Sequence, residues 1–163
     1  FLSPRILLLG AGGAARGALG PLLELKPRLL IVANRTAERA IEIAEDFAYL
    51  GPVSGCEFAK LENQRFDLIV NATSASLRGD VPAIPPGVVD SLTTCYDMAY
   101  GSGDTAFVTW AKTRGAGRAE QGWGMLVEQA AEAFFLWRGV RPDTAPALAA
   151  LRARSIRASR SPS

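Results

Sequence analysis

The stretch Leu7–Leu19, LLLGAGGAARGAL, places a run of leucines directly before a run of glycine and alanine. The apolar run begins at Arg5 and ends abruptly at Gly10, which is typical of a buried parallel strand. With Gly12 and Ala15, Gly10 then fits the pattern G-x-G-x-x-[G/A] at a strand-to-helix turn. In this pattern the first glycine permits a tight turn, the second lets backbone approach a pyrophosphate, and the alanine permits close helix packing. The stretch favours a dinucleotide site over an ordinary strand-to-helix turn.

The rest of the chain alternates between strand and helix patterns, which predicts an α/β fold. Such alternation is typical of a Rossmann-like, doubly wound parallel sheet flanked by helices. We expect Pro21 to kink the first helix. The expected strands are Arg5–Leu9, Leu29–Ala33, Cys56–Ala59, Asp67–Asn71 and Thr94–Met98, and the expected helices are 13–26, Thr36–Tyr49, Thr105–Arg114, Gly124–Arg138 and Thr144–Arg152, with a loop at Ser74–Gly87.

The composition is that of one globular domain, since 163 residues with 48% apolar content can bury a sizeable core. No apolar run reaches the roughly 20 residues that span a bilayer, and the start of the chain lacks the features of a secretion signal. With no histidine and only Cys56 and Cys95, neither a metal site nor a disulfide framework is expected. We therefore expect a cytoplasmic protein without a membrane partner.

The net charge of +2 is unevenly distributed. Residues 151–163 carry four arginines and no acid, so 14 basic and 16 acidic residues remain elsewhere, a body of about −2. We expect residues 1–154 to form the folded domain and the Ser/Arg-rich residues 155–163 to form a disordered tail. The body shows no basic stripe interleaved with aromatic residues, so no nucleic-acid partner is expected, although a nucleic-acid role for the tail stays open.

The end of the second expected strand indicates which dinucleotide is bound. An NAD site usually places Asp or Glu there to bind the ribose 2′-hydroxyl, whereas this chain has Asn34, Arg35 and Thr36, with Arg39 one helical turn further. Arginines and a hydroxyl suit a 2′-phosphate, which a carboxylate would repel. Each charge-assisted bond contributes about 1.5–3 kcal/mol, so two arginines would favour NADP by about a hundredfold or more. The alternative is that both arginines are solvated residues at a helix start.

Five motifs follow one another in the order and spacing of the shikimate dehydrogenases, and the chain resembles that family from about Arg5 to Leu151. The set is specific as a whole. A run like the second motif also occurs in glutamyl-tRNA reductase, and the last two motifs separate the two families. The motifs are Gly10–Gly17 (GAGGAARG), Asn34–Arg39 (NRTAER), Asn71–Ser74 (NATS), Tyr96–Tyr100 (YDMAY) and Gly122–Gln129 (GWGMLVEQ).

The resemblance implies an NADP-dependent oxidoreductase that interconverts 3-dehydroshikimate and shikimate in chorismate and aromatic amino-acid biosynthesis. It places Met98 and Gly122 beside the nicotinamide, and it implies that Tyr100 and Gln129 reach across the cleft to the substrate. By their residue types alone, Met98 would be a core residue and Tyr100 an ordinary loop tyrosine. The expected cofactor-binding residues are Gly10, Ala11, Gly12, Gly13, Ala14, Asn34, Arg35, Thr36, Arg39, Asn71, Ala72, Thr73, Met98 and Gly122.

Some features depart from the family pattern. Ser76 stands where the family usually has Gly, Gln121 replaces the usual Asp, and Trp123 is bulky beside the expected nicotinamide pocket. Members of the family also carry a substrate domain ahead of the nucleotide domain, with a catalytic Lys and a partnering Asp, and we expect that domain to be missing here. Ketone reduction needs a proton donor. No residue is therefore assigned as catalytic, and the chain alone is expected to be inactive.

Two other function classes stay open. One is a stand-alone NADP-binding module that senses the cofactor or regulates a partner. The other is an NADP domain like that of glutamyl-tRNA reductase, which would need a nucleophilic Cys in a preceding domain. The expected helix Gly124–Arg138 is apolar round nearly all of its circumference. We expect one of its sides to cover the sheet and the other to contact the missing domain. In the chain alone, that side should leave an apolar patch exposed, through which the chain self-associates.

Overall fold

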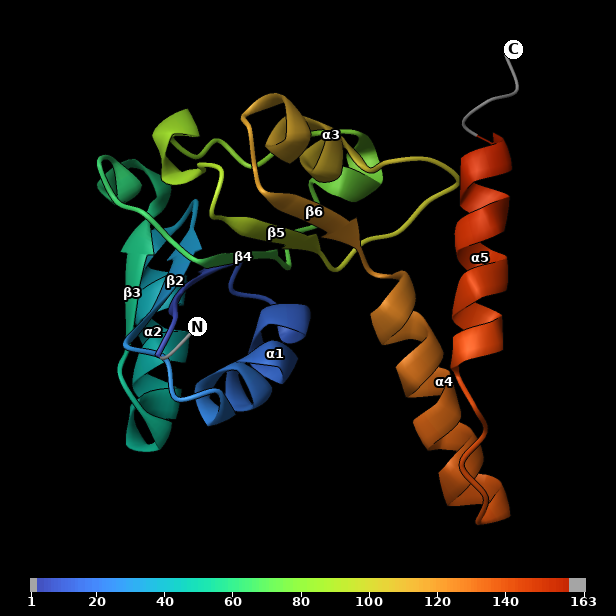
Figure 1. Cartoon of the computed structure of the whole chain (residues 1–163). Helices are drawn as coiled ribbons and strands as arrows, with labels where there is room; N and C mark the ends of the chain where they lie inside the picture. The colour runs from blue at the N-terminus through green and yellow to red at the C-terminus, as the bar shows by residue number, and fades with distance from the viewer. Residues whose placement is uncertain (1–2, 159–163) are drawn as a thin grey trace.

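The computed structural model describes residues 3–158 of the chain. No helix within that part is long and apolar enough to cross a membrane. Six parallel strands form one sheet, and five α-helices accompany them (Figure 1). The strands are β1 (Arg5–Leu9), β2 (Leu29–Asn34), β3 (Val53–Glu57), β4 (Leu68–Asn71), β5 (Thr94–Asp97) and β6 (Arg118–Gln121). The helices are α1 (Gly13–Glu24), α2 (Ala37–Phe47), α3 (Ala106–Thr113), α4 (Trp123–Arg138) and α5 (Ala145–Ala158).

The strand order is β3-β2-β1-β4-β5-β6, so the order reverses between β1 and β4. All pairs are parallel, with Leu9 beside Ala33 of β2 on one side and beside Asn71 of β4 on the other. This is the order of a Rossmann-like, doubly wound sheet, and the predicted fold class is confirmed. Ligands of such sheets bind outside the carboxyl ends of the strands at the reversal, which is where the glycine-rich bend lies.

Apolar residues of β1 alternate between two cores, one on each face of the sheet. Ile6 and Leu8 pack in the core beneath α1 and α2. Leu7 and Leu9 pack in the core on the opposite face, beneath α3 and the segment 58–89. All four side chains are fully buried. The continuous leucine run therefore reflects a central strand that is covered on both faces.

The structure differs from the expected elements at both edges of the sheet. β3 occupies Val53–Glu57 rather than Cys56–Ala59, and the edge strand β6 (Arg118–Gln121) was not expected. α1 continues through Pro21, because Leu19 and Leu23 on either side of it stay buried in the core.

The Ser/Arg-rich end of the chain is described only in part. α5 continues to Ala158, which lies inside the segment 155–163 that was expected to be a disordered tail. Residues 159–163 lie outside the described residues.

α4 begins beside β6 and extends away from the sheet, and α5 runs back toward the sheet (Figure 1), where Arg152 of α5 lies 3.5 Å from Glu120 of β6. Arg141, between the helices, pairs with Glu128 at 3.0 Å and with Glu132, and the Thr144 hydroxyl donates to Glu128 at 2.7 Å. We expected one side of α4 to cover the sheet, but among its described residues only Val127 and Ala131 are buried. The aromatic and aliphatic residues near its end are exposed, namely Phe134 (45%), Phe135 (42%), Leu136 (75%) and Trp137 (81%).

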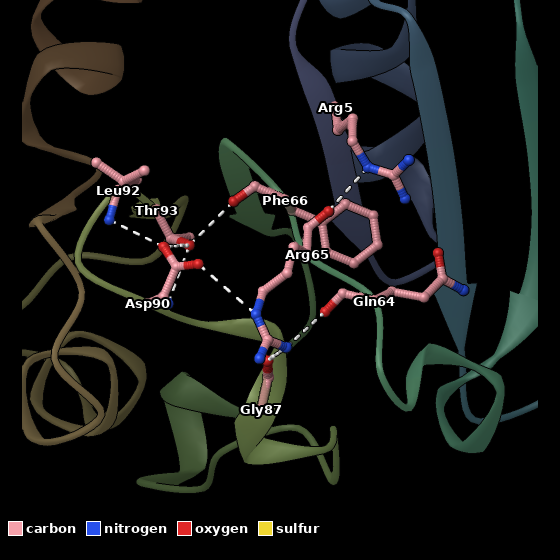
Figure 2. A network of polar contacts seen from close by, with 8 residues as sticks. All are labelled: Arg5, Gln64, Arg65, Phe66, Gly87, Asp90, Leu92 and Thr93. Carbon is pink, nitrogen blue, oxygen red and sulfur yellow. Dashed lines mark hydrogen bonds and ion pairs between the residues drawn. The ribbon is translucent and has the colours of Figure 1, made fainter.

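A polar network holds the amino ends of the strands together, at the edge of the sheet away from the glycine bend (Figure 2). Arg5 Nε, at the start of β1, donates to the Arg65 carbonyl at 2.9 Å. The Arg65 guanidinium contacts the Gly87 carbonyl and lies 3.6 Å from Asp90. The Thr93 hydroxyl, just before β5, donates to the Phe66 carbonyl at 2.9 Å. These contacts fix the amino ends of the strands, whereas the open loops lie at the carboxyl ends of the strands.

Candidate functional site

Gly10 forms the tight turn between β1 and α1. Its φ of +102° is a conformation that L side chains rarely adopt, and its N–H donates to the Ala33 carbonyl at 2.8 Å. A Cβ at this position would lie 3.2 Å from the carbonyl carbon of Ala72 and from Cγ2 of Thr73. The turn and the loop after β4 are therefore closely packed, and both the positive φ and the tight contacts favour glycine here.

Gly12 and Gly13 are glycines for a different reason. Gly12 has an extended backbone, with φ −97° and ψ −170°, which any residue adopts. A Cβ at either position would meet nothing within 4 Å. Packing within the described residues does not require a glycine at either position, and the open space leaves room for a ligand to approach the backbone.

The start of α1 is prepared for an anion. Gly12 is its N-cap residue and provides no side-chain cap, and no acidic residue lies in the first turn. Helix N–H groups at such an end point outward, and the helix dipole favours negative charge there. With open space at Gly12, these groups suit a pyrophosphate.

A cavity of about 480 Å³, the arginine cavity, lies between the ends of β2 and β4. Three of the residues that line it are arginines: Arg35, Arg39 and Arg78. Thr36, the N-cap residue of α2, makes no side-chain capping bond, and no ion pair involves Arg35 or Arg39 within the described part of the chain. The other lining residues are Asn34, Phe58, Thr73, Ser74, Ala75, Asp80, Val81, Pro82 and Ala83.

The predicted residues Asn34, Arg35, Thr36, Arg39 and Thr73 are thus brought together in one cavity. Arg78 also lines the cavity, and no motif in the sequence predicts it there. Its only signal in the sequence is a charge within a loop rich in Gly and Pro.

Asn71 is fully buried and shapes the loop that follows β4. Its side-chain oxygen accepts hydrogen bonds from the backbone N–H of Thr73 at 3.1 Å and from the Thr73 hydroxyl at 2.7 Å. Its Nδ2 donates to Ser76 and Asp97. Neither Asn71 nor Ala72 lines the arginine cavity. The geometry therefore supports a positioning role for Asn71 rather than a direct contact with a ligand.

Asp97, at the end of β5, is a fully buried carboxylate that joins three segments. Its oxygens accept hydrogen bonds from Asn71 Nδ2 at 3.1 Å and from the Ser76 hydroxyl at 2.6 Å. They also accept from the Thr105 hydroxyl at 2.6 Å and from the backbone N–H of Ala99 at 3.1 Å. Four donors satisfy the buried charge. The serine at 76, where the family usually has glycine, thus supplies one of these bonds.

A larger cavity of about 840 Å³, the apolar groove, runs over β4, β5 and β6 between α1 and α4. Gly13 and Ala14 line it beside the glycine bend, and Met98 and Gln129 line it as well. Burial raises the pKa of Tyr96 within it. Six of the strand residues that line it alternate along their strands and share one face of the sheet, namely Leu68, Val70, Thr94, Tyr96, Arg118 and Glu120, and Gln121 at the end of β6 lines it as well.

Gly122 permits close contact between the start of α4 and the loop after β5. A Cβ on it would lie 2.4 Å from the Met98 carbonyl oxygen, and its N–H donates to the Ala99 carbonyl at 2.9 Å. The amide of Gln121 accepts from the Gly101 N–H at 3.0 Å. Because glutamine can both accept and donate, it fixes this loop without the usual aspartate.

The two predicted substrate residues, Tyr100 and Gln129, do not share a cavity. The Tyr100 ring packs against Trp123, with centroids 4.9 Å apart. Tyr100 lines a separate cavity of about 360 Å³ between segments 76–79 and 99–106, whereas Gln129 lines the apolar groove. Trp123 Nε1 is buried and has no hydrogen-bond partner within the described residues.

The lysines and cysteines lie away from this chemistry. No lysine lines any of the three cavities within residues 3–158, and Lys112 is paired with Asp104 at 2.6 Å. Burial raises the pKa of Cys95 to about 12. Burial, and then the neighbouring Glu57, raise the pKa of Cys56. Neither thiol is activated as a nucleophile.

Comparisons with known proteins agree with this geometry. The family model described as Shikimate / quinate 5-dehydrogenase matches residues 1–78, and the model described as Shikimate 5'-dehydrogenase C-terminal domain matches residues 122–152. The curated shikimate dehydrogenase (NADP(+)) of Dechloromonas aromatica (strain RCB) is 55% identical over 156 residues. That match covers 96% of this chain and 57% of the relative.

Solved structures give the same result. The crystal structure of an Ael1 enzyme from Pseudomonas putida is 46% identical with a TM-score of 0.82, and the match covers 92% of this chain and 55% of that one. A shikimate dehydrogenase crystallised in complex with NADP+ is 29% identical with a TM-score of 0.76, over 94% of this chain and 55% of that one. The chain thus spans about half the length of the relatives it matches. With its motifs, its fold and these matches in agreement, the chain belongs to the shikimate dehydrogenase family.

Proposed function

We propose that this chain is the NADP-binding part of a shikimate dehydrogenase. The pyrophosphate of NADP binds at Gly10–Ala14, and the 2′-phosphate binds at Arg35, Thr36 and Arg39 in the arginine cavity. The observation that carries the proposal is a pair of arginines without ion-pair partners in the described chain, in a cavity beside a bend with open space at Gly12.

The charges of the arginine cavity favour NADP over NAD. Residues Asn34–Thr36, at the end of β2, include no carboxylate that would accept from a ribose 2′-hydroxyl. Two exposed guanidinium groups there can each form charge-assisted hydrogen bonds to a phosphate. At about 1.5–3 kcal/mol for each such bond, the two arginines favour NADP by about a hundredfold or more.

The nicotinamide end of NADP lies on the far side of the glycine bend, near Met98 and Gly122. When bound, NADPH supplies the hydride that reduces a ketone, here 3-dehydroshikimate to shikimate in aromatic amino-acid biosynthesis. The alkoxide that forms on the ketone oxygen needs a proton donor. No lysine of the described chain lines the three cavities described above, and in this proposal the donor comes from the substrate domain of the family. Tyr100 and Gln129 contact the substrate once that domain is present.

Two exposed apolar surfaces of this chain are suited to contact such a substrate domain. The apolar groove leaves one face of β4, β5 and β6 only partly covered, whereas parallel sheets are normally covered on both faces. The end of α4 also exposes Leu136 and Trp137 at 75% and 81%. Contiguous exposed apolar surface of this kind marks interaction sites.

Calorimetric titration with NADP+ and NAD+ tests the cofactor assignment. We expect the chain to bind NADP+ at least about a hundredfold more tightly, and the gap to shrink at high salt because the phosphate pairing is screened. Arg35→Asp should abolish or invert this preference. Arg114→Asp, at the exposed end of α3, is the matched control and should leave it unchanged. Equal affinities for the two cofactors would contradict the 2′-phosphate assignment.

Assays of shikimate-dependent NADPH formation test whether this chain supplies NADP binding and a separate substrate domain supplies the proton donor. We expect no turnover by the chain alone, and some turnover when it is mixed with the separately produced substrate domain of a related shikimate dehydrogenase. Tyr100→Phe should then lower turnover or substrate affinity without changing NADP+ binding. Robust turnover by the chain alone would show that it contains its own proton donor. NADP+ binding without turnover in any mixture would favour a cofactor-sensing module instead.

A further inference from the structure

Arg78 enters the arginine cavity from a different strand than the other two arginines. Arg35 and Arg39 follow β2, whereas Arg78 lies in the loop after β4. Both strands neighbour β1, and adjacent strands are about 4.8 Å apart, so the two strand ends lie roughly 10 Å from each other across the cavity. A ligand held between them meets arginines from both sides.

The backbone that carries Arg78 is held in place. Residues Ser76–Arg78 form a short 3-10 helix, and Gly79 follows with a left-handed φ of +76°. The Arg78 N–H donates to the Ala75 carbonyl at 2.9 Å, and the Ser76 hydroxyl donates to the buried Asp97 at 2.6 Å. The same buried network that shapes the cofactor loop therefore sets the position of Arg78.

The Arg78 side chain has only weak partners within the described residues. Its Nη1 donates to the Ser74 hydroxyl at 3.2 Å, and its Nε lies 3.6 Å from the Asp80 carboxylate. The side chains of Arg78 and Asp80 are 65% and 66% exposed. Solvent-exposed ion pairs of this kind contribute little, so a phosphate that offers several oxygens can displace Asp80.

The charge of the cavity matches a phosphate monoester. Three arginines and one aspartate give its lining a net charge of +2. A phosphate monoester carries about −1.5 to −2 at pH 7. Without Arg78 the lining would carry only +1, which is too little to balance such a group.

We propose that Arg78 binds the 2′-phosphate of NADP together with Arg35 and Arg39, and that Asp80 competes with this phosphate for the Arg78 guanidinium. The inference rests on the proposed NADP site and adds a third residue that selects NADP over NAD. Asp80 limits the affinity for NADP because its carboxylate must give up the guanidinium when the phosphate binds.

Calorimetric titration of the whole chain with NADP+ and NAD+ tests this role. Arg78→Ala should weaken NADP+ binding by about tenfold or more and leave NAD+ binding within about twofold of the original. Arg78→Lys keeps the charge but loses the fork geometry, so it should fall between the two. Asp80→Asn should strengthen NADP+ binding alone, by up to about fivefold. Arg114→Ala, which removes an exposed arginine away from the cavity, should change neither affinity.

The outcomes separate this inference from the proposed function. Unchanged NADP+ binding by Arg78→Ala would overturn the inference while leaving the NADP site intact, provided that Arg35→Asp still removes the preference. Equal losses for both cofactors would also overturn it, because they would indicate contact with the adenine instead. If the unaltered chain does not prefer NADP+, both proposals fail. Melting curves of each variant confirm that the comparison is between folded proteins.

Discussion

The two glycines of the bend, Gly10 and Gly12, should respond to substitution in opposite ways. A Cβ at Gly12 meets nothing within 4 Å, and its extended backbone suits valine. Gly12→Val should therefore cost at most about 1 kcal/mol, through a poorer helix N-cap. For a chain of this size that amounts to about 2–4 °C in melting temperature. Binding of both NADP+ and NAD+ should nevertheless be lost, because the isopropyl group occupies the space of the pyrophosphate.

Gly10→Ala should instead damage the fold. Its φ of +102° is strained for alanine, and the new Cβ would lie 3.2 Å from the Ala72 backbone. Such strain costs about 1–3 kcal/mol. Taking about 2 kcal/mol, we expect the melting temperature to fall by about 4–8 °C.

Thermal melting without nucleotide, together with calorimetric titration, measures both effects. Gly17→Ala is the matched control, because its Cβ also meets nothing within 4 Å but lies in the interior of α1. It should raise stability by about 0.5–1 kcal/mol, and because Gly17 lies outside the residues assigned to the pyrophosphate, it should not abolish binding as Gly12→Val does. Normal NADP+ affinity in Gly12→Val would refute the pyrophosphate assignment. If Gly12→Val melted at a temperature as low as that of Gly10→Ala, this would refute the inference that a side chain at position 12 meets no neighbouring atoms.

Two further predictions concern stability and association. Burial raises the pKa of Cys95 to about 12 from 9.0. The buried neutral thiol therefore makes its full contribution to the free energy of unfolding below pH 9. That contribution falls between pH 9 and 12, because the thiol ionises there in the unfolded chain but not in the folded one. The free energy of unfolding, measured in urea, should therefore decline relative to Cys95→Ala by about 1.4 kcal/mol per pH unit above pH 9, and a constant difference up to pH 10.5 would contradict the burial of this thiol. The exposed Leu136 and Trp137 should make the chain self-associate as its concentration rises. The double variant Leu136→Ser, Trp137→Ser should sediment as a monomer and bind NADP+ normally, and identical sedimentation of both proteins would contradict this prediction.

The central strands could be predicted from sequence, and the edge strands could not, for physical reasons. β1 and β4 are mainly apolar because both of their faces are at least partly covered. β3 contains Gly55, where a Cβ would lie 2.2 Å from the Ala40 carbonyl. Here α2 packs directly on backbone, so the middle of the strand carries no apolar side chain and only Val53 and Cys56 are apolar. β6, with the sequence RAEQ, has one neighbouring strand and an exposed first residue, and so lacks any apolar pattern.

The residues of the candidate site also differ in whether their positions could be predicted from the sequence. The places of Gly10 and Arg35 in the fold could be predicted because a local pattern fixes the position of each relative to a strand end. Arg78 could not, because its place in the cavity depends on how the loop after β4 folds back. Nor could sequence reveal that Tyr100 and Gln129 line different cavities, since that depends on where α4 leaves the sheet.

The alternation of β1 between the two cores has a consequence for cooperativity. Ile6 and Leu8 belong to one core, and Leu7 and Leu9 belong to the other. Neither core can melt while the other survives, because both lose side chains as soon as this one strand detaches. Residues 5–9 also bridge partners that are far apart in the chain, Leu29–Ala33 and Leu68–Asn71. The amides of β1 should therefore exchange with solvent only through global unfolding, whereas the glycine bend that begins one residue later can open locally.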